Sequence, residues 1–120
     1  MKESFGTFLR EKRKQREITV RAMASLVGLA CGSYCDFESG RRKPPGQEML
    51  HKMIHVLRLS GADKEIFYDL AGDARAVAPP DLPQYINDNQ IVRVALRIAK
   101  EKATDNDWQR FINDLDGRGN

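Results

Sequence analysis

Hydrophobic residues recur along most of the chain at intervals of three and four positions, the period of an α-helix with one buried side. The recurring positions are Phe5, Phe8 and Leu9; Met23, Leu26 and Val27; Tyr34 and Phe37; Leu50, Met53, Ile54 and Leu57; Ile66, Phe67 and Leu70; and Trp108, Phe111, Ile112 and Leu115. No segment alternates polar and apolar residues over the length of a strand, and no internal repeat is present. The pattern therefore predicts an all-α protein.

Residues that favour helix ends lie between these segments. Thr19 is a good N-cap for a second short helix, and Gly28 suits its C-terminal end, where a left-handed backbone is common. A third helix is predicted over residues 31–39, with Gly40 as its stop. A fifth helix is predicted to end at Gly72.

The stretch DARAVAPPDLP, residues 73–83, divides the chain into two parts. Its prolines interrupt continuous helix and favour extended backbone. We therefore expect a first domain over residues 1–72, a proline-containing linker over residues 73–83, and a helical extension over residues 84–120.

The extension is rich in hydrophobic residues. Those between Ile91 and Ala99 cover more than one side of a helix, which is wider than a single buried stripe needs. Thr104 with Asp107 resembles a capping box for the last helix, with Asp in place of the usual Glu or Gln. Three arrangements stay open: these helices pack on the first domain, on each other, or on a second copy as a dimerisation element.

A chain of 120 residues is long enough for one domain, or for a small domain with an appendage. No apolar run approaches the roughly 20 residues of a membrane span, and the start MKESFGTFLREKRK lacks the apolar segment of a signal peptide. We therefore expect a cytoplasmic protein without membrane contact. Because Cys31 and Cys35 are the only cysteines, a disulfide framework is not expected.

The net charge of +3 is unevenly distributed along the chain. Residues 1–72 carry 13 Lys and Arg against 9 Asp and Glu, whereas residues 73–120 carry 7 against 8. A basic first part favours an acidic partner for that part alone. Solvated helix faces are the alternative explanation.

Two short predicted helices joined through VGLA, the second followed by the basic turn GRRKPP, form a helix-turn-helix pattern. The segment ITVRAMASLVGLACGSYCDFESGRRKPP resembles the lambda-repressor-like regulators of the XRE family. The resemblance covers about residues 4–72 and depends on a combination of motifs. These are Ala24 and Gly28 at the corner between the helices, Asp36-Phe37-Glu38, Gly40-Arg41-Arg42, and Pro44-Pro45.

The resemblance implies a five-helix DNA-binding domain whose third helix enters the major groove of double-stranded DNA, with the following turn against the phosphate backbone. The positions that would face bases or the groove are Cys31, Gly32, Ser33, Cys35 and Asp36. The positions that would meet phosphates are Thr19, Arg21, Arg41, Arg42 and Lys43. It also implies a structural ion pair between Arg13 and Glu38, which would fix the angle between the first and third helices.

The cationic turn and Arg21 each have a second interpretation. Cations are favoured next to a helix C-terminus even when they contact only solvent. In a helix-turn-helix the phosphate-binding interpretation is preferred, because phosphate contacts commonly come from cations beside the recognition helix. For Arg21, the alternative is an ion pair with Asp36.

The third helix departs from the family pattern on its outer side. None of its exposed positions holds Arg, Lys, Gln or Asn, the side chains best suited to paired hydrogen bonds with a base. Ala30 replaces the Ser or Thr common at the helix start, and Gly32 lies inside the helix. We therefore expect few direct hydrogen bonds to bases, limited to Ser33 and Asp36. Sequence-dependent DNA shape would supply further discrimination between binding sites.

Two chemical alternatives involve the cysteines. Cys31 and Cys35 lie four residues apart, as do His51 and His55, and two cysteines with two histidines can bind zinc. The family geometry turns the two pairs apart, so neither a metal nor a cofactor is predicted. Oxidation of the two thiols that blocks DNA binding is a second hypothesis, and two unreactive small residues are the preferred explanation.

The sequence thus predicts a sequence-specific transcriptional regulator, a homodimeric repressor that binds double-stranded DNA. The alternative is a protein-interaction module, or an antitoxin-like protein, that binds a partner protein through the C-terminal helices. An enzyme is not predicted, because no Gly-rich phosphate loop, His-containing triad or paired carboxylates are recognisable.

Overall fold

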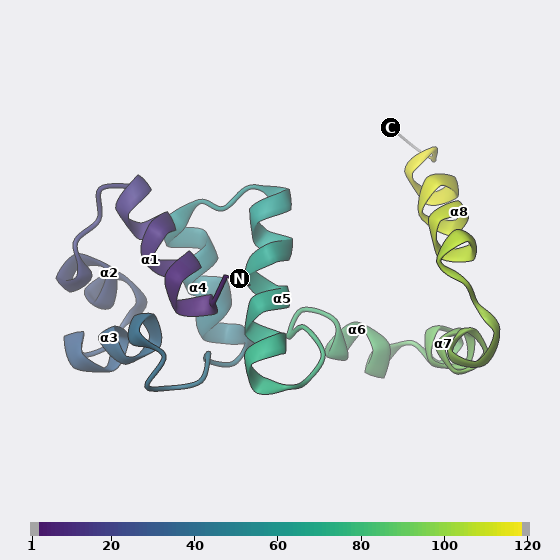
Figure 1. Ribbon diagram of the computed structural model, residues 1–120, viewed down its shortest axis with the longest axis horizontal. Helices are drawn as coiled ribbons and strands as arrows, with labels where there is room; N and C mark the ends of the chain where they lie inside the picture. The colour runs from purple at the N-terminus through teal and green to yellow at the C-terminus, as the bar shows by residue number, and fades with distance from the viewer. Residues whose placement is uncertain (1–2, 119–120) are drawn as a thin grey trace. The chain divides into compact units, whose positions relative to one another are not determined.

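The computed structural model describes residues 3–118, and within that range it consists of helices joined by turns, with no strand (Figure 1). The helices are α1 (Phe5–Gln15), α2 (Val20–Val27), α3 (Cys31–Ser39), α4 (Gln47–Leu57), α5 (Gly61–Arg75), α6 (Pro83–Asp88), α7 (Gln90–Lys102) and α8 (Asp105–Asp116). The predicted all-α class is confirmed, with five helices followed by further helices. None of the helices in this range is long and apolar enough to cross a lipid bilayer.

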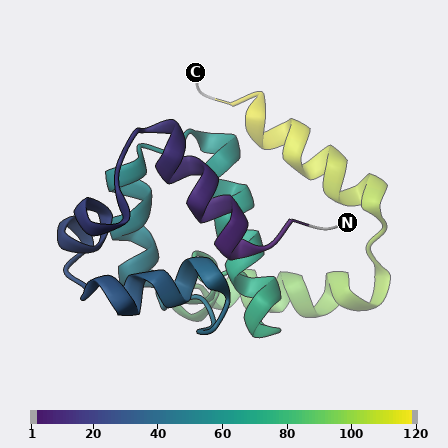
Figure 2. The ribbon, with the colours of Figure 1, turned by 60° about the vertical axis from the view of Figure 1, so that its left-hand side comes forward.

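The chain divides into two compact units, one ending at Pro83 and one beginning at Gln84. In the first unit, α1 contacts α3 and α5, while α2 contacts α3 and α4 (Figure 2). These contacts enclose a single hydrophobic core. Its buried members are Phe5, Phe8, Leu9, Met23, Ala24, Val27, Tyr34, Phe37, Leu50, Met53, Ile54, Leu57, Phe67, Tyr68 and Ala71.

An aromatic cluster joins the first and last helices of this core. Phe67 of α5 is fully buried, and its ring centroid lies 4.9 Å from that of Phe5 and 6.0 Å from that of Phe8. Tilted aromatic pairs at these distances stabilise a core beyond the area they bury. The cluster therefore holds α5 against α1.

The ends of α2 and α3 follow the sequence-based predictions. The side chain of Thr19 accepts a hydrogen bond from the backbone N–H of Ala22 (3.1 Å), as an N-cap does. Gly28 and Gly40 adopt left-handed conformations, with φ of 79° and 83°. Ala30 gives α3 no side-chain cap. Both helices are therefore short and sharply bounded.

Several cations of α1 serve the fold. Arg16 donates hydrogen bonds to the backbone carbonyls of Leu57 (2.8 Å) and Arg58 (3.0 Å), at the C-terminal end of α4. A cation there satisfies free carbonyls and is favoured by the helix dipole. Lys12 pairs with Asp63 at 3.0 Å. Part of the positive charge of α1 is thus used inside the first unit.

The end of α5 differs from the prediction. The helix does not stop at Gly72 but continues to Arg75, and Ala76 takes the left-handed conformation after it (φ 57°). The reason for glycine at position 72 is steric: a Cβ atom there would lie 2.8 Å from the backbone nitrogen of Pro79. Glycine is required because the chain after α5 folds back against this position.

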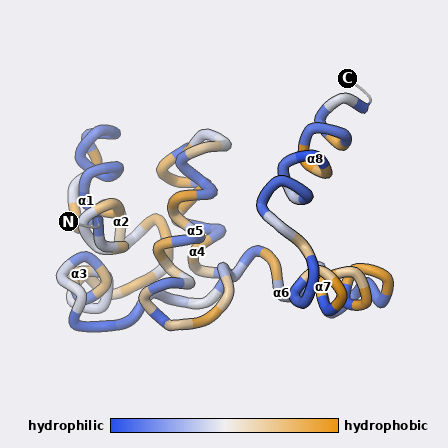
Figure 3. Tube along the Cα trace, turned by 45° about the vertical axis from the view of Figure 1, so that its right-hand side comes forward, coloured by the Kyte–Doolittle hydropathy of each residue, from blue (hydrophilic) through white to orange (hydrophobic). Residues whose placement is uncertain are grey.

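The second unit has regular helices but no buried residue among residues 84–118. The capping box of α8 is confirmed: Thr104 accepts from the N–H of Asp107 (3.2 Å), and the Asp107 carboxylate accepts from the N–H of Thr104 (2.9 Å). The short helix α6 was not predicted. Hydrophobic residues recur along α7 and α8 (Figure 3), and they remain largely exposed.

Candidate nucleic-acid interface

Helices α2 and α3 are joined by a turn of three residues, 28–30, and pack closely at their corner. Ala24 is almost fully buried there, and its carbonyl accepts a hydrogen bond from the N–H of Leu29 (2.8 Å). Met23 and Val27 of α2 are also buried. A small residue at position 24 lets the two helices approach each other, so the corner has a fixed geometry.

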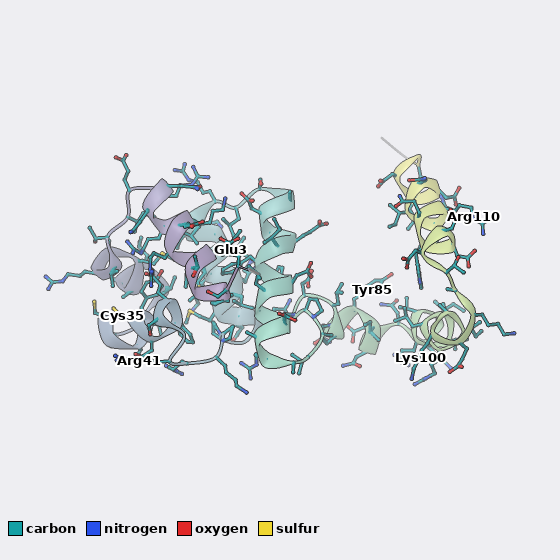
Figure 4. The ribbon with its side chains drawn as sticks, viewed as in Figure 1. Glu3, Cys35, Arg41, Tyr85, Lys100 and Arg110 are labelled. Carbon is teal, nitrogen blue, oxygen red and sulfur yellow. The ribbon has the colours of Figure 1, made fainter. Side chains whose placement is uncertain are left out.

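Helix α3 has one buried and one open side. Tyr34, Phe37 and Glu38 are buried against the rest of the first unit. On the other side Cys31, Gly32 and Cys35 are exposed, and Ser33 and Asp36 are half-buried. Figure 4 shows Cys35 on the outer side of the first unit, with Arg41 near the C-terminal end of the same helix. The outer side of α3 is therefore a narrow surface of small side chains.

A buried ion pair connects α3 to α1. The Arg13 guanidinium donates to both carboxylate oxygens of Glu38, from Nε at 2.7 Å and from Nη2 at 3.1 Å. Each residue is only 8% exposed, and Arg13 also donates to the carbonyl of Ile18 (2.9 Å). Although burial disfavours the charged carboxylate, the hydrogen bonds from Arg13 hold the pKa of Glu38 below its ordinary value. The paired geometry fixes α3 relative to α1.

The turn after α3 is held by contacts on both sides. The N–H of Arg42 donates to the carbonyl of Asp36 (3.2 Å), and its guanidinium lies 4.8 Å above the ring of Phe37. Arg75, from the end of α5, donates to the carbonyl of buried Pro44 (2.6 Å). The cationic turn is thus anchored at its start by α3 and at its end by α5.

The cations of this turn are exposed. Arg41, Arg42 and Lys43 are all open to solvent, and Arg41 approaches Asp36 only at 3.9 Å. Arg41 is 82% exposed along its side chain, so this contact leaves its charge available to a partner.

A hollow of about 370 Å³ lies between the turn and the start of α1. Arg10, Arg42 and Lys43 line it together with the hydroxyl-bearing Ser4 and Thr7. Glu38 and the apolar side chains of Phe5, Phe37 and Pro44 also line it, so the lining is of mixed character.

The two remaining phosphate candidates lie at the start of α2. Thr19 is the N-cap of that helix and Arg21 is exposed in its first turn. Within residues 3–118 no ion pair joins Arg21 to Asp36, so the structure does not support that alternative.

Residues 4–66, more than half of the chain, match the family model of the helix-turn-helix domain. The chain belongs to the helix-turn-helix domain family. A search of curated proteins and a search of solved structures found no match. Membership of this family assigns the first unit to DNA-binding regulators, with α2 and α3 as its two characteristic helices.

Two residues that position the helix-turn-helix were missed by sequence reasoning. Arg10 donates to the carbonyl of Glu38 (3.4 Å) at the end of α3, and Arg75 holds Pro44. Arg10 lies in a cationic run that has no distinguishing spacing, whereas Arg75 falls after the expected end of α5. Only the packing of distant segments identifies both.

Cys31 and Cys35, the two cysteines of α3, are free thiols and both are exposed. Partial desolvation, followed by the neighbouring Cys31 thiol and the nearby acidic side chains, raises the pKa of Cys35. A raised pKa lowers the thiolate fraction and hence the rate of oxidation. His51 and His55 instead line a shallow hollow with Leu26, and within residues 3–118 no three potential ligands converge on one point.

Proposed function

We propose that the protein is a sequence-specific transcriptional repressor of the XRE family that binds double-stranded DNA as a homodimer. The observation that carries the proposal is the exposed outer side of α3 next to three exposed cations on an anchored turn. A helix of small residues can approach the floor of a groove closely, and cations at its end can meet the backbone beside it.

Phosphate contacts supply most of the affinity in this proposal. Arg41, Arg42 and Lys43 neutralise phosphates on one side of α3. On the other side, Thr19 and Arg21 place the free N–H groups at the start of α2 against the backbone. Each neutralised phosphate releases counterions, so the affinity falls steeply as the salt concentration rises.

Base recognition depends on five positions of α3. Ser33 donates to or accepts from a base edge, and Asp36 accepts from a cytosine amino group. Cys31, Gly32 and Cys35 contribute contact rather than paired hydrogen bonds. The remaining discrimination comes from the cost of deforming the DNA under the protein.

The proposed homodimer addresses two half-sites about one helical turn apart, roughly 34 Å. The second unit is the proposed pairing element, because its hydrophobic side chains are exposed and the first unit encloses its own core. As a repressor, the dimer occupies a promoter and excludes other proteins. Neither a cofactor nor catalysis is part of this function.

Salt-dependent DNA binding tests the proposal. The full chain is titrated onto a labelled duplex by fluorescence anisotropy at several salt concentrations. Replacing Arg41 and Arg42 with Ala is expected to weaken binding and to lower the slope of log K against log salt by about 2, since each phosphate contact contributes about 0.9. The matched control replaces Lys52 and Lys64 with Ala, which removes the same charge from α4 and α5.

Equal slopes for both variants would overturn the assignment of the turn to phosphate binding. Selection of bound duplexes from a random pool then tests specificity. A set of recovered sequences with a shared motif supports a regulator of defined promoters, whereas recovery without a motif contradicts sequence-specific binding.

A second candidate function is supported by the exposed hydrophobic residues of the second unit. The protein would then be an interaction module or an antitoxin-like protein whose C-terminal helices bind a different protein. Such a protein keeps the helix-turn-helix frame, and its α7 and α8 remain uncovered until the partner binds.

A further inference from the structure

Two hydrophobic stripes run along the helices of the second unit. The α7 stripe consists of Ile91, Val94 and Ile98, which are 77%, 41% and 58% exposed. The α8 stripe consists of Trp108, Phe111, Ile112 and Leu115, which are between 37% and 52% exposed. Each stripe repeats at helical spacing, so it forms one continuous face of its helix.

Neither helix is long enough to be stable alone. They have 13 and 12 residues, and isolated helices of this length are marginal in water. Helices in globular proteins gain most of their stability when a hydrophobic face is covered. Because no residue between 84 and 118 is buried, that cover must come from outside the unit as it stands.

The two helices carry opposite charges. Helix α7 has four cations against one carboxylate, and α8 has four carboxylates against one cation. The cations of α7 are Arg93, Arg97, Lys100 and Lys102, and the carboxylates of α8 are Asp105, Asp107, Asp114 and Asp116. Each helix therefore suits the other as a partner in charge as well as in hydrophobicity.

Some of these charged side chains already form hydrogen bonds or ion pairs within the second unit. Arg93 donates to the carbonyls of Ile86 and Asn87, at the end of α6. On α8, Asp107 pairs with Arg110, and Asp114 pairs with Arg118.

Within residues 84–118, charged side chains without an ion pair lie beside both stripes. Arg97 lies one turn after Val94, and Lys102 lies one turn after Ile98. Asp105 and Asp116 lie seven residues before and four residues after Ile112, on the same side of α8.

Within one chain the two stripes do not cover each other. Lys102 ends α7 and Asp105 begins α8, and the two residues between them, Ala103 and Thr104, are extended (ψ 143° and 167°). These two residues join the helices by an extended step, and no residue of either helix is buried by the other. Figure 4 shows the side chains of both helices and labels one cation on each, Lys100 on α7 and Arg110 on α8.

We propose that a second copy of this chain covers the stripes, with α8 of each copy packing on α7 of the other. This inference rests on the homodimer proposed above and names the surfaces that form it. The contact is isologous: the α7 stripe meets the partner's α8 stripe twice, once on each side of a two-fold axis. Arg97 and Lys102 of one copy then face Asp105 and Asp116 of the other.

Charge reversal in the full chain tests this pairing by sedimentation. The monomer has a mass of 13.6 kDa, and the wild type is expected to sediment at twice that mass. Replacing Arg97 and Lys102 with Glu turns four attractive pairs per dimer into repulsive ones. The dimer dissociation constant is expected to rise roughly 10- to 100-fold, given the modest energy of each exposed pair. Asp105→Lys with Asp116→Lys is expected to act equally.

The decisive sample mixes the two charge-reversed variants. In the mixture each reversed helix can pair with the reversed helix of the other chain, and the two unreversed helices pair as in the wild type. A heterodimer is therefore expected to form with near wild-type affinity. The matched control, Lys52→Glu with Lys64→Glu, makes the same change of charge on α4 and α5 and is expected to leave the dimer unchanged.

Each other outcome overturns the pairing. If both charge-reversed variants dimerise as tightly as the wild type, the stripes are covered in another way. The same conclusion follows if the two variants stay monomeric when mixed. A wild-type monomer at all concentrations overturns the homodimer as well. DNA binding by the first unit is measured separately in the salt titration, so its failure is distinguishable from failure of the pairing.

Discussion

The first and second units have helices of similar regularity, yet only the first encloses a core. In the first unit Leu9, Met23 and Phe67 are fully buried, whereas in residues 84–118 no side chain is. Both units show helical spacing and side-chain caps. The contrast teaches that periodicity reports which face of a helix is hydrophobic, while tertiary contacts decide what covers that face.

The same contrast applies to charge. In α1, Lys12, Arg13 and Arg16 are bound to partners on other helices of the first unit. In α7 and α8, Arg97 and Asp105 have no ion pair within the described residues 3–118. Unpaired charges beside uncovered hydrophobic stripes support the pairing surface that we propose for the second unit.

The largest expected effect compares the same substitution in both units. Phe67→Ala removes a fully buried ring and is expected to destabilise the first unit by about 3 to 5 kcal/mol. Phe111→Ala removes a ring that is 52% exposed, and at protein concentrations that favour the monomer we expect a loss below about 1 kcal/mol. Urea unfolding followed by circular dichroism measures both. Equal losses would contradict a core confined to the first unit.

The next effect compares a buried ion pair with a partly buried one. Glu38→Ala leaves Arg13 buried without its carboxylate and is expected to lower the free energy of unfolding by about 3 kcal/mol. Asp63→Ala removes the carboxylate that pairs with Lys12; because this pair is only partly buried, we expect a loss of about 1 kcal/mol. The same urea titration measures both variants. Similar values for the two would mean that the Arg13–Glu38 pair does not organise the fold.

The pH dependence of stability follows from the same pair. The pKa of Glu38 is lower in the folded state than the ordinary value of about 4.3, so its contribution is complete above that value. It is lost as the pH falls through the folded-state pKa. The stability advantage of the wild type over Glu38→Gln is therefore expected to narrow below about pH 4. Urea unfolding at pH 7 and pH 3 checks this, and a constant advantage would contradict it.

The smallest effect compares the two threonine caps. Thr19→Ala and Thr104→Ala each remove one N-cap hydrogen bond and are expected to cost about 1 kcal/mol of helix stability. In the first unit this loss lowers the free energy of global unfolding. In the second unit it is expected to unfold α8 locally, which fluorescence of the single tryptophan, Trp108, reports. A change in global unfolding after Thr104→Ala would mean that the units unfold together.

Much of the fold was predictable because its determinants are local. The spacing of Phe5, Phe8 and Leu9 predicted the buried side of α1, and Thr19 and Gly28 predicted the bounds of α2. The end of α5 was wrongly predicted, because Gly72 was interpreted as a stop signal. Glycine is needed at position 72 because the backbone of Pro79 packs closely against it. The local sequence pattern around Gly72 does not show that Pro79 lies there.

For the candidate interface, the sequence supplied the residue types and the structure supplied their supports. The outer positions of α3 and the cations of the turn were selected on the motif and its family resemblance. That Arg75 holds Pro44, and that Arg42 stacks on Phe37, required the folded chain. The first contact joins residues 31 positions apart, and the second depends on how the turn folds back over α3. Neither contact can be read from residue spacing in the sequence.

By itself, the sequence determined the helical class, the helix-turn-helix motif and the hydrophobic faces of α7 and α8, because these depend on neighbours within one turn of helix. Only the tertiary structure decided which of those faces are covered and which cations of α1 are already bound. Whether a hydrophobic face is buried or a charge is paired depends on which distant segments of the chain pack against it, and a single residue does not carry that information.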